Sequence, residues 1–363
     1  MRYKPNWDEA QERLSAMWEG RAAGRPCISI TAPSGEAVPA PAAPEDPERK
    51  WLDPGWVLAD MSAALANTWW GGEAVPSYLF MGGWAVCLGG RPRFAADTIW
   101  FETFETEPAG ESPFRTTADD PWLRKYETLL CAAAEAAQWD DFLIGTPCIL
   151  PANDLLSMHM GPEAFLLALV DAPRWMRDAI VLGAREQLTA WLRIMDRVKE
   201  RARFWYGNGG WMPFWAPQPY ASTQSDVSCM LSPEMFEEFV VPELDVFGGH
   251  FGAMWYHLDG ADARQHLPRL LSLPYLRVIQ YTPRPSEPPN GPAHLDFYRR
   301  IQSSGRIVHI EVPKGNVEPL VKALDPRLLM MHVGCESESE GRELLEAARL
   351  WTMPPRAVKG GGK

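Results

Sequence analysis

The fold is decided by the segment Ala253-Met254-Trp255-Tyr256-His257-Leu258-Asp259-Gly260. This apolar run ends in a histidine, a carboxylate two residues later, and a glycine. Residues two apart on a β-strand face the same side, so His257 and Asp259 can present a nitrogen and an oxygen ligand together at the C-terminal end of a strand. Gly260 then lets the chain turn away. Two interpretations stay open: a functional site, or a core histidine hydrogen-bonded to Asp259.

The last third of the chain alternates strands and helices with short connections. Its pattern predicts strands at 253–258, 276–281, 306–312 and 328–333, and helices at 261–271, 293–304, 316–324 and 337–352. Repeated strand-then-helix units imply parallel strands joined by right-handed crossovers. With the earlier segments, about eight such units are expected, which predicts a (β/α)8 TIM-type barrel with an extended N-terminal region.

The earlier segments are less regular. The patterns predict helices at 7–18, 51–68, 120–137 and 162–203, the last interrupted at Asp171-Ala172-Pro173, and strands at 27–31, 97–102, 141–150 and 203–207. Residues 33–50 are rich in proline and are expected to form a long loop. A Rossmann fold is disfavoured because Ala32-Pro33-Ser34-Gly35 is no glycine-rich phosphate turn. We expect a single barrel domain over residues 1–363.

Composition limits the partners. The formal net charge of -12 and the absence of a basic cluster argue against nucleic acid and anionic membranes, both of which favour clustered lysine and arginine. No run approaches the length of a membrane span, and the N-terminus has no signal-peptide core, so a cytoplasmic location is expected. Six cysteines in 363 residues are too dilute for a disulfide framework and are free thiols or ligands. A small-molecule substrate is the expected partner, and the sequence leaves the oligomeric state open.

Aromatic residues gather at the predicted strand ends. The 17 tryptophans are many for this length. We expect an aromatic pocket for a flat, sugar-like or methylated cationic ligand, because quaternary ammonium groups favour aromatic faces. Its predicted lining is Trp100, Tyr206, Trp211, Trp215 and Tyr281, with Glu102, Asp154 and Asp226 as carboxylates and Gln224 and Gln280 as polar neighbours. Plain core packing is the alternative for each aromatic residue.

Several of these segments carry a family resemblance over most of the chain. They are Thr98-Ile99-Trp100, Asp171-Ala172-Pro173, Gln224-Ser225-Asp226 with Leu231-Ser232-Pro233-Glu234-Met235-Phe236, Tyr256-His257-Leu258-Asp259-Gly260, and Ile279-Gln280-Tyr281. Together they resemble the uroporphyrinogen decarboxylase-like superfamily, which includes cobalamin-dependent methyltransferases and is related to cobalamin-independent methionine synthase. The resemblance implies a TIM-type barrel with its site at the C-terminal ends of the strands.

Two departures narrow the reaction. The decarboxylases carry an arginine-rich N-terminal segment for a polyanionic substrate, which residues 1–50 lack. The methyltransferase branch binds zinc through a His-x-Cys-Gly strand end and a distant second cysteine, whereas this chain has His257-Leu258-Asp259-Gly260, followed much later by Cys335. The resemblance therefore implies zinc held by His257, Asp259 and Cys335, with a fourth position open. A buried thiol is the alternative for Cys335, and His332 and Glu336 are possible substitutes as the third ligand.

The expected function is methyl transfer. We expect a methyl group to move between a small substrate, such as a methylated amine or ether, and a corrinoid on a partner protein or a thiol. The expected catalytic residues are His257, Asp226 and Asp259. A decarboxylase or lyase acting on a small acid is one alternative, and a ligand-binding barrel without catalysis is the other.

Overall fold

A computed structural model describes most of the chain. The described residues are 1–21, 24–35, 37–80, 92–102, 108, 110, 112, 114, 120–137, 142–146, 150–201 and 204–352, except for the side chains of residues 101, 146 and 204–206. Within them, no helix is long and apolar enough to cross a membrane.

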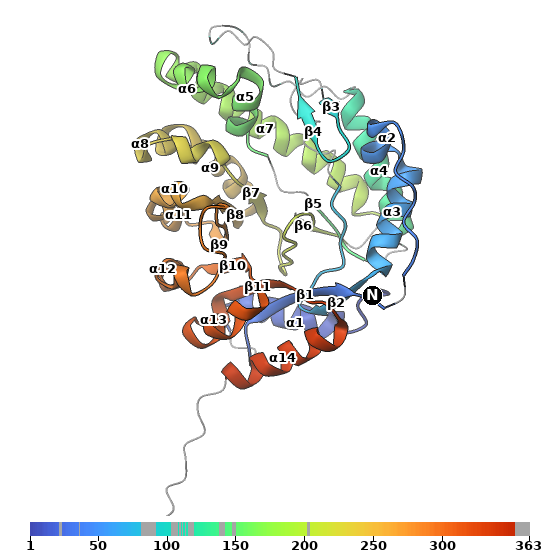
Figure 1. The fold of residues 1–363 in the computed structure, drawn as a ribbon. Helices are drawn as coiled ribbons and strands as arrows, with labels where there is room; N and C mark the ends of the chain where they lie inside the picture. The colour runs from blue at the N-terminus through green and yellow to red at the C-terminus, as the bar shows by residue number, and fades with distance from the viewer. Residues whose placement is uncertain are drawn as a thin grey trace, which may run out of the picture.

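A seven-stranded, mostly parallel sheet curves through the molecule (Figure 1). Its order is β2 (Thr68–Gly72), β1 (Cys27–Pro33), β11 (Leu329–Gly334), β10 (Ile307–Glu311), β9 (Leu276–Thr282), β8 (Met254–Asp259) and β7 (Ala221–Thr223). Only β2 runs antiparallel, against β1. A separate parallel pair is formed by β5 (Ile144–Thr146) and β6 (Phe204–Asn208). The predicted α/β class with parallel strands is confirmed. A closed barrel stays a prediction, because no ladder among the described residues joins β6 to β7 or β5 to the β2 edge.

Helices surround the sheet (Figure 1). They are α1 (Trp7–Trp18), α2 (Pro47–Leu52), α3 (Pro54–Ala66), α4 (Pro121–Ala136), α5 (Ala152–Met160), α6 (Pro162–Asp171), α7 (Pro173–Val198), α8 (Pro233–Met235), α9 (Val241–Phe251), α10 (Gly260–Ala263), α11 (Leu267–Ser272), α12 (Leu295–Ser303), α13 (Val317–Ala323) and α14 (Glu338–Thr352). Local chemistry sets several starts: Asp53, Asp120 and Ser232 each accept a backbone N–H as an N-cap, and each is followed directly by proline.

The last four strand-helix units and the helix at 7–18 lie where the patterns predict them. Three segments differ. The predicted helix at 51–68 is α2 and α3, separated at Asp53-Pro54, where Asp53 caps the second helix. The predicted barrel strand at 97–102 is β4 (Ile99–Phe101), which pairs only with β3 (Pro92–Phe94) in a hairpin. The three-residue strand β7 is too short to show the alternation that periodicity detects.

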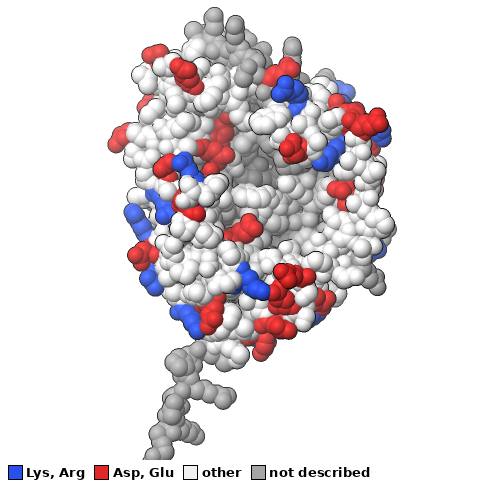
Figure 2. Space-filling model, viewed as in Figure 1, with Lys and Arg blue, Asp and Glu red and all other residues white. Residues whose placement is uncertain are grey.

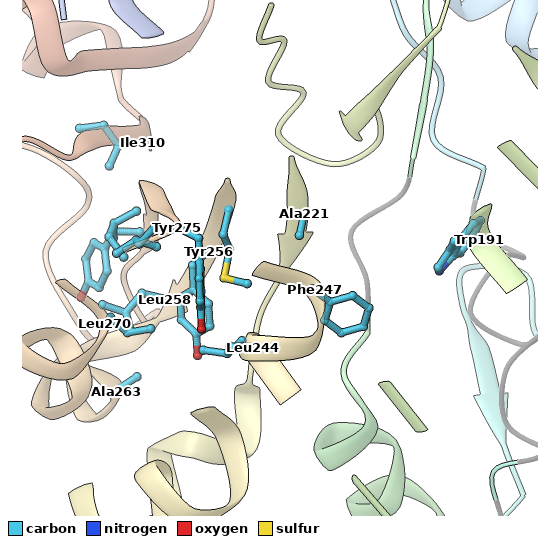
Figure 3. Close-up of a cluster of buried hydrophobic side chains, with 14 of the residues drawn as sticks. Trp191, Ala221, Leu244, Phe247, Tyr256, Leu258, Ala263, Leu270, Tyr275 and Ile310 are labelled. Atoms are coloured by element: carbon cyan, nitrogen blue, oxygen red, sulfur yellow. The ribbon is translucent and has the colours of Figure 1, made fainter. Parts of the chain in front are cut away.

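Alternating residues of the strands face two different cores. On the outer face, Tyr256 and Leu258 of β8 lie among Leu244, Ala263 and Leu270 of helices α9, α10 and α11 (Figure 3). On the inner face, the first residues of the strands form a second cluster with one side of α1, including Trp7, Leu14, Cys27, Trp255, Val278, Ile307 and Met330. Helix α1 therefore plugs the end of the sheet where the strands begin, and the other end is left for a site.

That open end is hollowed. Figure 2 shows a recess in the middle of the molecule, with Asp and Glu side chains around its edge. Parallel strands bring all their C-terminal ends to the same side, so His257, Gln280 and Glu311 share this rim.

Candidate functional site

His257 lies on the inner face of β8 and is buried. It is in register with Gln280 of β9, and its Nδ1 is hydrogen-bonded to the Gln280 side-chain oxygen Oε1. Gln280 is itself oriented because its Nε2 donates to Thr282 Oγ1 at 3.0 Å. A carbonyl oxygen can only accept, so Nδ1 of His257 carries the hydrogen. The other nitrogen, Nε2, is not engaged by this hydrogen bond.

Trp211 forms a wall beside this imidazole. The two ring centroids are 4.8 Å apart and the rings are perpendicular, at 89°. Trp211 is 40% exposed, which is unusual for so large an apolar side chain and leaves much of its indole open to solvent. An exposed aromatic face next to an imidazole can contact a ligand directly.

Asp226 lies within electrostatic range of His257 and of two further carboxylates, Asp154 and Asp259. Asp154, in the first turn of α5, is buried, and its oxygens accept the backbone N–H groups of Asp226 at 3.0 Å and Val227 at 2.9 Å. Asp154 therefore holds the backbone at Asp226 and at the following residue, Val227. Asp226 itself is exposed, accepts a hydrogen bond from Gln224 Nε2 at 2.8 Å, and is close enough to His257 and Asp259 to feel their charges.

These carboxylates hold protons unusually well. Removal of water by the surrounding protein, reinforced by the charge of Asp154, raises the pKa of Asp226 to about 7, although His257 acts in the opposite direction. Burial likewise raises the pKa of Asp154 to about 6, against the two backbone N–H donors. The pair is thus partly protonated near neutral pH, as expected for carboxylates that share a site.

A buried glutamate, Glu243, holds the start of α5, which carries Asp154. Glu243 of α9 accepts hydrogen bonds from the backbone N–H groups of Ala152 and Asn153 and, at 2.8 Å, from Asn153 Nδ2. Ser225 in turn donates to Asn153 Oδ1 at 3.1 Å. Burial raises the pKa of Glu243 to about 8, against these donors. One carboxylate thereby ties α9, the start of α5 and the Asp226 segment together.

A second hollow opens at the same rim, over the ends of β9, β10 and β11. Its volume is about 410 Å³, and its lining includes Thr282, Asn290, Glu311, Lys314 and Gly334. Thr282 links this hollow to Gln280 and so to His257. The rim therefore offers space of small-molecule size, connected to the imidazole through the side chains of Thr282 and Gln280.

Comparisons with known proteins give a fold but no family. No family model matches the sequence, and no curated protein matches it. Among solved structures, a methyltransferase from Methanosarcina mazei is similar over 94% of this chain and 98% of its own, with a TM-score of 0.58 and 14% identity. This chain shares that methyltransferase's fold. A glycoside hydrolase family 5 enzyme from Prevotella bryantii B14 covers 65% of this chain and 78% of its own with a TM-score of 0.29 and 9% identity, which carries no argument.

The structure brings part of the predicted site together. The His257 ring contacts two predicted residues: it is hydrogen-bonded to the amide of Gln280 and packs against the indole of Trp211. Asp226 and Asp259 lie within electrostatic range of each other, and Gln224 donates to Asp226. The membership of the superfamily suggested by the sequence stays a prediction.

The predicted aromatic cage is not assembled. Trp215 is buried beneath the site, against Trp7 of α1 at a centroid distance of 5.8 Å. Tyr281 faces the helices, where its hydroxyl is hydrogen-bonded to Arg264 and Glu287. Trp100, 55% exposed, and Glu102 belong to the β3–β4 hairpin and the residue after it. The side chain of Tyr206 lies outside the described residues, so of the proposed lining only Trp211 is seen at His257.

The predicted zinc ligands are not brought together either. Cys335 belongs to the outer core between sheet and helices, and its backbone N–H donates to Thr31 O at 2.9 Å. Burial raises the pKa of its thiol, which opposes the thiolate that zinc requires. Among the described residues no three His, Cys, Asp or Glu side chains are grouped to hold a metal. The alternative for Cys335, a buried thiol, fits the structure, and we derive no step through zinc.

Sequence reasoning missed two polar residues that shape the site, Glu243 and His309, and it placed Asp154 in a loop rather than in the first turn of α5. Glu243 lies in helix α9, and the surrounding sequence does not distinguish a buried glutamate at this position from a solvent-exposed one. His309 and His332 alternate with apolar neighbours on β10 and β11, and this inward spacing was a usable signal.

Asp226→Asn is expected to stabilise the protein in alkaline solution. The pKa of Asp226 is higher in the folded chain, about 7, than in an unfolded chain, about 3.9. The folded state therefore binds the proton more tightly, and its stability falls as pH rises between these values. Because Asp226 is exposed and solvent screens its charge, we expect a melting temperature only about 1–2 °C higher at pH 8, and no gain at pH 4. Thermal melts against pH test this, with the fully exposed Asp296→Asn as control.

Proposed function

We propose that the protein is a methyltransferase that accepts a small methylated ammonium compound at the rim around His257. The observation that carries the proposal is the combination of the exposed Trp211 indole with carboxylates around the His257 imidazole. Aromatic faces and carboxylates both attract a methylated cation. The fold shared with a methyltransferase is compatible with this reaction but does not choose it, because one fold supports many reactions.

Charge separates this proposal from decarboxylation of a small acid. Asp154, Asp226 and Asp259 would repel an anionic substrate. Three basic side chains in the segments after β8, β9 and β10 are paired with carboxylates of their own: Arg264 with Glu287, Arg284 with Asp262 and Lys314 with Glu340. A cation is therefore the better electrostatic match for these surroundings.

The reaction we propose moves CH₃ from nitrogen to a nucleophile. The attacking electron pair forms the new bond to the methyl carbon, the C–N bond breaks, and its electrons stay on nitrogen as a neutral amine. The acceptor would be a thiol or a corrinoid carried by a partner protein, either of which supplies that electron pair. With a thiol, Nε2 of His257 would take the S–H proton before attack and release it to solvent afterwards.

Binding is tested first with choline and its neutral isostere dimethylbutanol by calorimetry. Selective binding of choline supports the proposal, and transfer of its methyl group to an added thiol or reduced cobalamin, followed by mass spectrometry of both products, tests the reaction. Binding without transfer to any acceptor would favour the ligand-binding barrel. Equal affinity for the neutral isostere would contradict recognition of the cation.

Trp211→Leu is expected to weaken choline binding by about 1–2 kcal/mol, because the aliphatic side chain lacks the negative face of the indole. Trp100→Leu is the matched control, since Trp100 is also exposed but lies on the β3–β4 hairpin. Titration calorimetry of both variants measures the difference. If both lose affinity equally, or neither does, Trp211 is not the cation wall.

A further inference from the structure

Two imidazoles lie on the inner face of the curved sheet, near the candidate site. His309 of β10 is completely buried, and the ring of His332 on β11 lies beside it, with centroids 4.8 Å apart. Trp255 Nε1 donates a hydrogen bond to His309 Nδ1 at 2.8 Å. Interior positions of such barrels are usually filled by branched apolar side chains. The presence of two histidines at these interior positions therefore indicates a specific role.

The contacts determine the proton position on each ring. Indole N–H can only donate, so Nδ1 of His309 carries a lone pair and Nε2 of the neutral ring carries the hydrogen. His332 is hydrogen-bonded to the backbone of Pro213, which offers only a carbonyl oxygen, so His332 is the donor. Among the residues that the structure describes, Nε2 of His332 has no hydrogen-bond partner, which makes Nδ1 the donor.

The two rings are stable only as neutral groups. Burial lowers the pKa of His332 to about 4 and that of His309 well below its usual value. Within the described part of the chain, Nε2 of His309 and Nε2 of His332 both lack hydrogen-bond partners; the first carries a hydrogen and the second a lone pair. An extra proton would therefore add a buried charge and a further N–H without an acceptor.

Pro213 lies in the turn that presents Trp211. Met212, between them, has φ of 52°, the one non-glycine residue with positive φ among the described residues. Asn208 Nδ2 donates to the carbonyls of Trp211 at 2.6 Å and Met212 at 2.9 Å. Side chains thus bind three consecutive carbonyls: Asn208 binds those of Trp211 and Met212, and His332 binds that of Pro213. A strained turn persists only when its surroundings fix it in this way.

We propose that His332, backed by His309, is a positioning residue that fixes the turn at Met212 and so holds Trp211 against His257. The imidazole of His309 contributes by packing on His332 and on Phe214, at centroid distances of 4.8 and 5.2 Å. Its bond to Trp255 prevents it from rotating. The consequence for ligand binding rests on the proposed function, whereas the fixing of the turn does not.

The proton positions are tested directly in the wild-type protein. With seven histidines in the chain, ¹⁵N-histidine labelling gives a spectrum simple enough to assign by single replacements. At pH 7 we expect His332 to carry its proton on Nδ1 and His309 on Nε2. A charged His332, or one protonated on Nε2, would overturn the proposal, whether or not any variant folds.

Two replacements of His332 separate its hydrogen bond from its mere presence. Asparagine places an amide N–H near the Nδ1 position and can still donate to Pro213, whereas leucine cannot. The reporter is the Phe214 amide, which donates to Asn208 O at 2.9 Å within the same turn. Its hydrogen exchange is expected to be about ten-fold faster in His332→Leu, as for loss of one buried hydrogen bond, and close to wild type in His332→Asn.

Ligand binding distinguishes the two proposals. Choline affinity is expected to fall about ten-fold in His332→Leu and to be retained in His332→Asn. Unchanged Phe214 exchange in His332→Leu would overturn the positioning role, whatever choline does. Faster exchange in a protein whose wild type binds no choline would leave the positioning role supported and refute the proposed substrate.

Discussion

Glu243→Ala is expected to lower the free energy of unfolding by about 2–4 kcal/mol, the range for removing a buried group whose hydrogen-bonding partners stay behind. Glu243 is fully buried, and the amides of Ala152 and Asn153 with the Asn153 side chain all donate to it. None of these donors can reach water in its place. Urea denaturation at pH 7 measures the loss.

Glu243→Gln is the graded comparison, because it keeps one acceptor oxygen and the side-chain volume; we expect a loss of about 1–2 kcal/mol. Glu238→Ala is the surface control, since Glu238 is exposed only five residues earlier, and should change stability by less than about 0.5 kcal/mol. A Glu243→Ala loss no larger than that of Glu238→Ala would show that Glu243 does not brace α5.

The effect is expected to reach the site because one chain of contacts connects them. Loosening the first turn of α5 frees Asp154, whose oxygens hold the backbone at Asp226 and Val227. Glu243→Ala protein that is still folded should therefore bind choline more weakly than Glu238→Ala protein. In the proposed function, Glu243 would therefore affect binding of the cation through Asp154 and Asp226 without contacting the cation.

The strand-helix repeat made the fold predictable. Apolar periodicity and short connections locate β8 to β11 closely, and alternation on β8 and β9 correctly brings His257 and Gln280 to one face. The same alternation explains why Cys335 packs in the outer core. His332 points inward, so the residue three positions later belongs to the outer face, and spacing counted along the sequence does not show this.

Other parts of the site could not be read from local pattern. Trp211, Trp215 and Tyr281 are all aromatic and near strand ends, yet one lines the site, one packs on α1, and one faces the helices. Which way each points depends on the turn at Met212 and on tertiary partners. Asp154 acquires its role only because α5 folds back against the residues after β7.

Asp226→Asn is expected to weaken choline binding at pH 8 by about 1.5–3 kcal/mol, the range for contacts to a charged group. It should also flatten the pH dependence of binding between pH 6 and pH 8, where Asp226 titrates. In the wild type the pKa of Asp226 is raised to about 7, so its carboxylate is ionised above that pH and protonated below it. A cation gains from the ionised form only, and affinity should fall about ten-fold between pH 8 and pH 6.

Choline keeps its charge throughout this range, so the change reports on the protein. Asp154 and Asp226 titrate as a pair, and the midpoint measured by calorimetry belongs to both. Asp296→Asn, a fully exposed carboxylate on α12, should leave the pH profile unchanged. Affinity that rises as the pH falls, or a profile that survives Asp226→Asn, would remove Asp226 from cation recognition. Binding would then depend on Trp211 and Asp259 beside His257.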